Sequence, residues 1–464
     1  MKIQFMGAAR TVTGSKHLIT TQKGTKVLLD CGLFQGIDTD DLNQNFHFNP
    51  ADVDYLLLSH AHIDHTGLVP RLVRQGFTGP IYCTHATADL CNIMLLDSAH
   101  IQETDLKRVN ERRQRQGRPL LDMLYDVGDV EQALSQIRTI RYNESFWLNE
   151  DIQVLYTDAG HLLGSAAISL TIREDGHTKR LFFSGDIGRP NDKILHKPEP
   201  FPQADYIICE STYGASLHEP ETDMKAHLLR IVEQTCVKNR GKLIIPAFAV
   251  DRTQEVVYAL DQLASEGLLP VLPVYVDSPL AVKATRVMQD NEDCFNPEIL
   301  RYIHKDGDAF DFPNLHYVSE VADSKAINDR PGPCVIISAS GMAEAGRIKH
   351  HIKNNIEDPR NTILLVGYAS PSSLGGALKR GDKQVRIFGE TFDVRARVAV
   401  MDALSAHADY AEMLDYLSCQ NPAEVKKVFL VHGDYDEQQI WKEKLQDAGF
   451  QHVEIPDMYE AVNL

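Results

Sequence analysis

The chain has 464 residues, which is too long for one ordinary domain and sufficient for two or three. Hydrophobic residues make up 43% and charged residues 24%, a globular balance that excludes intrinsic disorder for the bulk of the chain. With 65 acidic against 47 basic residues, the net charge of −18 excludes a uniformly basic nucleic-acid binder. Several of the 19 histidines are clustered, and a polyanionic substrate would need a local basic patch or a metal site.

The sequence carries no signal for a membrane or for secretion. No apolar run approaches the roughly 18 residues of a membrane span, and residues 1–7 indicate a first strand rather than a signal peptide. The eight cysteines are dispersed and form no CxxC pair. We therefore expect buried, reduced thiols, a cytoplasmic protein and no membrane contact.

The first two hundred residues predict short strands separated by turns, with few helices between them. Apolar runs cover residues 26–30, 53–59, 152–157, 166–172 and 180–184. Three of these runs lead into polar residues: Asp30, the histidines after Ser59, and Asp186. Polar residues at the ends of buried strands are where α/β folds commonly place their chemistry.

From about residue 205 onward, strands alternate with helices. Strands are expected at 242–246, 274–277, 334–338 and 362–367, and helices from Arg252, after Asp277 and over 345–355. This alternation predicts a doubly wound, mainly parallel sheet. No GxGxxG motif follows any of these strands, so a dinucleotide site is not expected. The final segment returns to the strand-and-loop pattern of the first part.

The cluster His60-Ala61-His62-Ile63-Asp64-His65 is the strongest chemical signal in the chain. His60 and His62 alternate and can point together, while Asp64 and His65 can face a second centre on the adjacent turn. Neutral imidazoles with a carboxylate suit zinc, or another borderline first-row metal, better than calcium or magnesium. A single histidine would more often be a core or loop residue, but three in six residues with an acid favour a metal site.

One short segment cannot complete two metal shells, so further ligands are expected at other strand ends. His161, Asp186 and His432 are the candidates, and the Asp186 carboxylate could bridge two metals. Each alone is a weak signal, because an isolated strand-end His or Asp more often caps or hydrogen-bonds. Asp30 either orients a ligand histidine from outside the metal shell or simply forms a turn.

The segment His60-x-His62-x-Asp64-His65, together with Asp30, His161 and Asp186, resembles the four leading motifs of the metallo-β-lactamase superfamily. Motifs A, B and C of its β-CASP branch are resembled by Glu210 to Gly214, Ser405 to Asp409 and Val431 to Asp434. Asp251 to Glu255 and Ser338 to Met342 are also similar to β-CASP sequence. The resemblance runs from end to end and is nearest to the RNA-specific, zinc-dependent nucleases. That group contains the endonuclease subunit of the cleavage and polyadenylation specificity factor and compact prokaryotic homologues.

The resemblance implies an αββα metallo-β-lactamase sandwich that is interrupted by a β-CASP domain. The expected limits are residues 1–205 and 396–464 for the split metallo-β-lactamase domain and 206–395 for the β-CASP domain. A catalytic cleft is expected between the two domains. This organisation agrees with the strand and helix pattern, and it explains a metal ligand as far downstream as His432.

The resemblance also implies two Zn²⁺ ions per chain. One ion is assigned to His60, His62 and His161, the other to Asp64, His65 and His432, with Asp186 bridging. A hydroxide activated by two metals would attack the phosphorus. His407 would be the general acid, positioned by Glu210; Asp64 and Asp30 complete the residues expected to serve catalysis.

RNA is the expected substrate partner, and two basic regions are candidate contacts. Residues 101–118 carry a charge of +3 and are either a solvated helical face or an RNA-contacting arm. Arg347, Lys349, His350 and His351 could line a phosphate track. The residues predicted to bind substrate are Ser338, Ser340, Arg347, Lys379 and Arg380.

The chain departs from the family pattern in the segment Gly367 to Gly376, which lacks the usual Gln and the usual basic residue. This loss puts phosphate contacts there in doubt, although Lys379 and Arg380 are near enough in sequence to compensate. The chain also lacks any recognisable KH domain or other added RNA-binding domain. Because family members are often dimers, the resemblance is compatible with a homodimer.

The sequence is compatible with several functions. An endonuclease acting on single-stranded RNA is favoured over a 5′-to-3′ exonuclease of the ribonuclease J type, because Leu404-Ser405-Ala406-His407 lacks the His-x-Ser-Gly-His form of that group. A hydrolase of small esters or thioesters is disfavoured by the complete β-CASP motifs. A non-catalytic RNA-binding homologue is disfavoured because every candidate ligand is retained.

Overall fold

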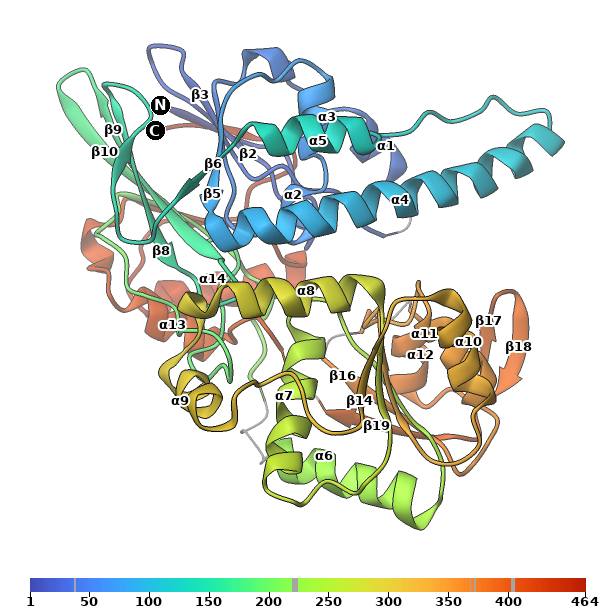
Figure 1. Ribbon diagram of the computed structural model, residues 1–464. Coiled ribbons are helices and arrows are strands. Elements are labelled where there is room, and N and C mark those ends of the chain that lie inside the picture. Colours follow the sequence, from blue (N-terminus) through green and yellow to red (C-terminus); the bar gives the residue numbers. More distant parts are fainter. Residues whose placement is uncertain (37–38, 219–223, 368, 371–372, 402–404) are drawn as a thin grey trace. The chain divides into compact units, whose positions relative to one another are not determined.

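The computed structural model describes residues 1–36, 39–218, 224–367, 369–370, 373–401 and 405–464. The chain forms two compact units (Figure 1): the first unit is Met1–Leu217 with Ala406–Leu464, and the second unit is His218–Ser405. One unit is thus inserted into the other in chain order. The expected domain limits at 205/206 and 395/396 stay a prediction.

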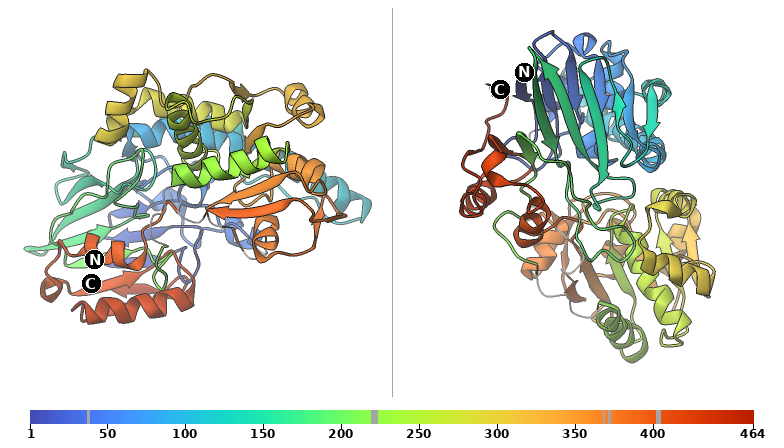
Figure 2. Two further views of the ribbon diagram at one scale, coloured as in Figure 1. Left: turned by 90° about the horizontal axis from the view of Figure 1, so that it is seen from below. Right: turned by 90° about the vertical axis from the view of Figure 1, so that its left-hand side faces the viewer.

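The first unit contains two seven-stranded sheets. The first sheet runs in the order β22 (Ala461–Asn463), β1 (Lys2–Phe5), β2 (His17–Thr20), β3 (Lys26–Leu29), β4 (Tyr55–Leu57), β5 (Ile81–Thr84) and β6 (Ile137–Ile140). The second runs β21 (Val453–Glu454), β20 (Lys427–Leu430), β11 (Tyr206–Cys209), β10 (His177–Phe183), β9 (Ala166–Glu174), β8 (Ile152–Asp158) and β7 (Phe146–Trp147). Because β1 pairs with β22, the two chain ends lie side by side in every view (Figures 1 and 2).

Apolar side chains from the two sheets pack against each other in one core. This core includes Ile3, Val27 and Leu57 from the first sheet and Ile168, Ile208 and Phe429 from the second. A second cluster joins the opposite face of the second sheet to α13 (Tyr410–Leu417) and α14 (Tyr435–Asp447). The remaining helices of the unit are α1 (Asp40–Gln44), α2 (Ile63–Thr66), α3 (Val69–Arg74), α4 (His85–Arg115) and α5 (Val127–Ser135). Helix α4 packs against β5 and β6, which completes the predicted αββα sandwich.

The second unit is built on a six-stranded sheet in which every pairing is parallel. Its order is β14 (Leu315–Val318), β13 (Val274–Asp277), β15 (Val335–Ser338), β12 (Leu243–Pro246), β16 (Thr362–Val366) and β19 (Arg397–Met401). Its helices are α6 (Met224–Val232), α7 (Arg252–Ser265), α8 (Pro279–Asp290), α9 (Pro297–Asp306), α10 (Val321–Asp329), α11 (Ile348–Asn355) and α12 (Leu374–Arg380). An antiparallel hairpin, β17 (Gln384–Ile387) with β18 (Glu390–Asp393), follows α12. The doubly wound prediction is confirmed.

One helix starts later than the sequence pattern predicts. Helix α11 begins at Ile348 rather than Ala345. Gly346 has φ +77°, a left-handed conformation that a right-handed helix cannot include. The backbone at Gly346 therefore delays the helix start.

Strand direction in the first unit brings the predicted site residues to one place. Strands β10, β11 and β20 are parallel neighbours, and β8 runs in the same direction because β9 is antiparallel to both β8 and β10. The carboxyl ends of these strands therefore meet at one edge of the second sheet. The residues that follow them are His161, Asp186, Glu210 and His432.

Two expectations about the environment of the chain can be compared with the structure. Within the ranges described above, no helix combines the length and the apolar character that crossing a membrane requires. Seven of the eight cysteines are buried, and Cys419 is exposed.

Candidate metal centre and active site

The histidine cluster is held by a backbone contact that requires a glycine. After β4, the chain passes His60 and His62 and forms the single turn of α2, which carries Asp64 and His65. Ser15 N–H donates to the Asp64 carbonyl, and Cys31 N–H donates to the His65 carbonyl. A Cβ atom on Gly32 would lie 1.6 Å from the Asp64 carbonyl oxygen, so no larger residue fits there.

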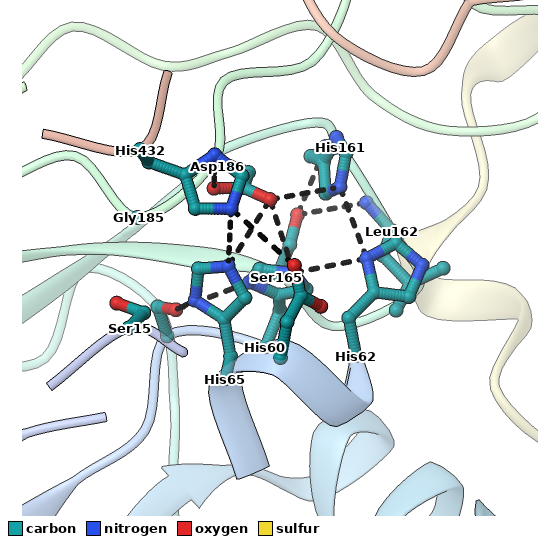
Figure 3. Close-up of polar contacts among 12 residues, drawn as sticks. Ser15, His60, His62, His65, His161, Leu162, Ser165, Gly185, Asp186 and His432 are labelled. Atoms are coloured by element: carbon teal, nitrogen blue, oxygen red, sulfur yellow. Dashed lines mark hydrogen bonds and ion pairs between the residues drawn. The ribbon is translucent and has the colours of Figure 1, made fainter. Parts of the chain in front are cut away.

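The first group of candidate ligands consists of His60, His62, His161 and Asp186, whose donor atoms lie within 4.8 Å of one another. His60 Nε2 and His161 Nε2 each lie 3.5 Å from Asp186 Oδ2. His62 Nδ1 lies 3.0 Å from His60 Nε2 and 3.3 Å from His161 Nε2. Nitrogen atoms of the three rings therefore face one position beside the Asp186 carboxylate (Figure 3).

The second group consists of Asp64, His65 and His432, again within 4.8 Å. His432 Nε2 lies 3.4 Å from Asp64 Oδ2 and 3.2 Å from His65 Nε2. Asp186 joins this group as well, because His65 Nε2 is 3.3 Å from its Oδ2 and His432 Nδ1 is 3.6 Å from its Oδ1. Asp186 thus lies within 3.6 Å of ring nitrogens from both groups, and its role as a bridging ligand stays a prediction.

The donor set fits metal ions better than it fits a hydrogen-bonded network. Tetrahedral zinc with Zn–N bonds of 2.0–2.1 Å separates its nitrogen ligands by about 3.3 Å, and the ring-nitrogen separations here are 3.0–3.3 Å. Asp186 Oδ1 is buried and has no hydrogen-bond partner among the described residues. A buried carboxylate oxygen without a donor is costly unless a cation compensates it.

Protonation in the site also suits metal binding. Burial lowers the pKa of His62 to about 4 and lowers the pKa values of His60 and His161 well below the usual range, so these rings are neutral, the form in which histidine binds metals. Burial opposes the charge of Asp186, but His432 and His65 hold its pKa well below the usual range. His65 differs: burial lowers its pKa, but Asp186 and Asp30 raise it well above the usual range. A metal would replace that proton.

Asp30 is placed to orient His65. Its Oδ2 lies 2.7 Å from His65 Nδ1 and also accepts a hydrogen bond from the Ser59 hydroxyl, while Oδ1 accepts from the Ser59 N–H. Asp30 is fully buried. Its φ of +56° and the +51° of His432 are uncommon for residues other than glycine. Such strain is found where the surrounding structure holds a residue for a specific task.

His407 and Glu210 form a pair beside the two groups. His407 Nδ1 lies 3.1 Å from both Glu210 carboxylate oxygens, and His407 Nε2 lies 4.0 Å from Asp186 Oδ2. Glu210 is fully buried and accepts a 2.6 Å hydrogen bond from the Ile187 N–H. Burial lowers the pKa of His407, but the Glu210 charge and hydrogen bond outweigh it and raise the pKa to about 9.

The residues predicted to bind substrate lie in the second unit, and four of them contact other residues of that unit. The buried Ser338 hydroxyl donates to the Asp277 carbonyl, and Arg347 Nη1 lies 2.6 Å from Asp277 Oδ1. The half-buried Ser340 hydroxyl accepts from the Ala345 N–H. Lys379 and Arg380 are exposed on α12, where Arg380 forms an ion pair with Asp382. Substrate binding by these five residues stays a prediction.

The expected phosphate track of residues 347–351 is only partly at the surface. His351 is fully buried, with Nε2 2.6 Å from Asp277 Oδ2 and Nδ1 3.0 Å from Asn328 Oδ1. It therefore belongs to the interior, which is a correction. Helix α4 carries most of the 101–118 segment, where every residue is exposed or half-buried, so both interpretations remain open. In the segment Gly367 to Gly376, which departs from the family pattern, residues 368 and 371–372 lie outside the described residues. Leu404 of motif B also lies outside them.

Sequence reasoning missed Lys16, which is buried beside the site. Its Nζ donates to the carbonyls of Gly14 (3.0 Å) and Gly32 (2.7 Å) and lies 4.2 Å from the centre of the Phe34 ring. Lys16 thus ties together the two loops that hold the α2 backbone. A lone lysine after a Gly-Ser pair carries no sequence signal of burial, because lysines are mostly exposed.

The buried Lys16 predicts a pH dependence of stability. Burial lowers its pKa from 10.5 to about 8, partly offset by Cys31. Between these two values the unfolded chain binds more protons than the folded chain, so stability increases with pH. We expect the free energy of unfolding of the wild type to increase by about 3 kcal/mol relative to Lys16→Met between pH 7 and pH 10.5. Parallel stability curves from denaturant titrations would contradict this.

Comparison with known proteins agrees with this architecture. Residues 18–199 match the metallo-beta-lactamase superfamily domain, residues 253–378 match the Beta-Casp domain, and residues 391–456 match the Zn-dependent metallo-hydrolase RNA specificity domain. The three matches occur in the order that an interrupted domain requires. The first and third fall on the first unit except for residues 391–405.

Similar proteins cover nearly the whole chain. Ribonuclease TTHA0252 of Thermus thermophilus is 36% identical over 94% of this chain and 93% of its own length. The transcription termination factor FttA of Methanosarcina mazei is 30% identical over 94% of this chain and 67% of its own length. An RNase J-like protein of Methanocaldococcus jannaschii is 29% identical, covering 93% and 92%. With its ligand groups, its sandwich and these matches, the chain belongs to the β-CASP family of the metallo-β-lactamase superfamily.

Proposed function

We propose that this chain is a zinc-dependent ribonuclease that binds two metal ions and cleaves single-stranded RNA internally. The observation that carries the proposal is the pair of ligand groups joined at Asp186 beside the His407–Glu210 pair. The name of the relative Ribonuclease TTHA0252 and the RNA specificity domain support RNA as the substrate. The cytoplasm is the compartment we infer for such an enzyme.

Each ligand group would hold one ion. His60, His62 and His161 would hold the first, Asp64, His65 and His432 the second, and Asp186 would be shared. Zinc in this position supplies Lewis acidity and makes a nucleophile available at neutral pH. The Asp30 carboxylate would orient His65 by accepting a hydrogen bond from its Nδ1–H, so that Nε2 faces the ligand group.

The His407–Glu210 pair would supply the proton that the leaving oxygen takes up. The Glu210 carboxylate accepts from His407 Nδ1, which fixes the ring and leaves Nε2 directed toward Asp186. In hydrolysis that yields 3′-hydroxyl and 5′-phosphate ends, the bond from phosphorus to the 3′ oxygen breaks as the water oxygen bonds to phosphorus. His407 Nε2–H would donate its proton to that departing 3′ oxygen.

Circular RNA tests the proposal directly. Zinc-loaded protein should linearise a single-stranded RNA circle and should cut a 5′-labelled linear RNA of the same sequence at internal positions. Cleavage confined to the linear RNA, with mononucleotide release from its 5′ end, would show an exonuclease instead. Failure to cut either RNA with zinc present would contradict the ribonuclease proposal.

Salt should weaken RNA binding, since an acidic chain must hold the phosphates through local cations. Three neutralised phosphates on a single strand predict a loss of affinity of about 20-fold between 50 and 200 mM monovalent salt. The KM for RNA as a function of salt measures the slope. The KM for the small diester bis(p-nitrophenyl) phosphate provides the comparison. If the KM for RNA depends on salt no more than this KM does, phosphate contacts outside the metal centre are contradicted.

The same measurement decides between the two interpretations of residues 101–118. Replacing Lys107, Arg112 and Arg115 by glutamine removes three positive charges. If this part of α4 is an RNA-contacting arm, the slope of log KM against the logarithm of the salt concentration should decrease by about 2. An unchanged slope would identify it as a solvated helical face. Replacing Lys238, an exposed lysine of the second unit, is the control.

A further inference from the structure

Helices α10 and α11 and the β17–β18 hairpin come together on the second unit (Figure 1). They carry basic side chains beside an exposed aromatic ring. We call Lys325, Lys349, His350, Lys353 and Phe388 the α11–hairpin patch. Helix α11 and the hairpin share one apolar cluster, formed by Ile348, Ile352, Val385 and Ile387 among others. The patch therefore rests on a packed base, and its side chains are held close to one another.

Phe388 is the aromatic centre of the patch. It sits at the hairpin turn with φ +52° and is 49% exposed. Its ring centre lies 4.6 Å from that of His350 and 5.2 Å from Lys349 Nζ. Hairpin turns with positive φ favour Gly, Asn and Asp, so turn formation gives no reason for a phenylalanine here. Its ring is bordered by His350 and Lys349, and about half of the side chain stays exposed to a ligand.

The electrostatic environment of the patch is positive although the chain as a whole is acidic. Lys325 and Lys349 form no ion pair with any described residue, while Lys353 pairs with the exposed Glu390. Burial lowers the pKa of His350, and so do the charges of His351, Lys353, Lys325 and Lys349. The basic groups that lower the pKa of His350 thus come from its own helix and from α10.

An aromatic ring bordered by cations is the combination that binds single-stranded nucleic acid without sequence preference. Bases stack on the ring, and lysines contact the phosphates. One exposed ring among lysines offers little of the surface, roughly 800 Å² per partner, that a stable protein interface buries. The chemistry therefore favours RNA over a protein partner.

We propose that the α11–hairpin patch is a second RNA-binding site, in which one base stacks on Phe388 and the flanking phosphates contact Lys325 and Lys349. This inference rests on the proposed ribonuclease function, because it takes the substrate to be a single-stranded RNA that extends beyond the scissile phosphate. The patch contributes affinity for long substrates and takes no part in the hydrolysis.

Kinetics with long and small substrates test this site. Phe388→Ala should raise the KM of the zinc-loaded protein for oligouridylate by about 5- to 150-fold, the range of one lost base stack, with little change in kcat. Phe388→Tyr, which keeps a ring, should restore the KM. Lys349→Ala should raise the KM and reduce its salt dependence. Turnover of bis(p-nitrophenyl) phosphate should be the same in the wild type and in Phe388→Ala.

A matched control is available in the first unit. Trp147 is 44% exposed and lies under Arg173, with 4.6 Å from the guanidinium carbon to the ring centre, so it is an aromatic–cation pair outside the patch. Trp147→Ala should leave the KM for oligouridylate unchanged. Equal effects of Trp147→Ala and Phe388→Ala would show a general loss of exposed aromatic surface and would overturn the site.

Photocrosslinking separates this site from the proposed function. RNA containing thiouridine should crosslink to the peptide that carries Phe388, and Lys349→Ala should weaken the crosslink. If the wild type crosslinks there but cleaves no RNA, the site stands and the ribonuclease proposal fails. If it cleaves RNA while neither the crosslink nor the KM effect of either variant is found, the site is overturned. If either variant changes the molecular mass of the protein in solution but changes neither the crosslink nor the KM for RNA, the patch is a protein contact and the RNA site is overturned.

Discussion

Replacing His407 by alanine is expected to lower kcat for RNA cleavage by about 10²- to 10⁴-fold, the range for loss of a general acid. Metal content should remain that of the wild type. The reason is geometric: His407 Nδ1 is taken by the buried Glu210, and its Nε2 lies 4.0 Å from Asp186 Oδ2, farther than the ligand histidines. Its ring faces the site without belonging to either of the two ligand groups that Asp186 joins.

Two further variants make this prediction specific. Glu210→Gln keeps the size of the side chain but removes the charge opposite His407 Nδ1, and it should lower kcat less than His407→Ala does. His452→Ala removes an exposed histidine of the same unit and should change neither kcat nor metal content. An unaltered kcat in His407→Ala would remove His407 from the mechanism. Loss of metal in this variant would make it a ligand.

Replacing Asp186 by alanine is expected to remove both metal ions at once. Its carboxylate lies 3.3–3.6 Å from nitrogens of His60, His65, His161 and His432, so both groups lose their shared oxygen donor. The affinity for zinc should fall by more than the 10- to 100-fold typical of residues outside the metal shell. RNA cleavage should fall to background. Elemental analysis after gel filtration and thermal unfolding with added zinc are the measurements.

The assignment of Asp186 to both ligand groups also depends on this result. Asp175→Asn alters an exposed turn of the same unit and should retain both metal ions, which controls for a general charge effect. Asp186→Asn keeps the side-chain volume but offers a weaker ligand. Its affinity for zinc should therefore lie between that of Asp186→Ala and that of the wild type. Retention of two ions in Asp186→Ala would show that the carboxylate is not shared, whereas loss of a single ion would place it in one group.

Much of the site was accessible from the sequence because its signal is local. His60, His62, Asp64 and His65 lie within six residues, and their spacing alone indicates ligands. Asp186 and His432 are isolated in sequence, yet each follows an apolar run, and parallel strands end at one edge of a sheet. The doubly wound sheet followed from the alternation of strands and helices, whereas the interrupted αββα sandwich followed from the family resemblance.

Other features depend on contacts that no local pattern records. Lys16 is buried because two distant loops present carbonyl oxygens to it, and His351 is buried because Asp277 and Asn328 come together around it. The exposed ring of Phe388 becomes meaningful only when α11 is seen to place its lysines beside the hairpin. Nonlocal pairing of polar groups is where prediction from sequence alone stops.

Zinc titration of chelator-treated protein, with RNA cleavage as the readout, tests the central claim most directly. The two ligand groups joined at Asp186 predict that chelation abolishes cleavage of single-stranded RNA. Zinc should then restore it, with full activity reached at two equivalents per chain. Cleavage that survives complete removal of metal, or no cleavage at any zinc concentration, would contradict a metal-dependent ribonuclease.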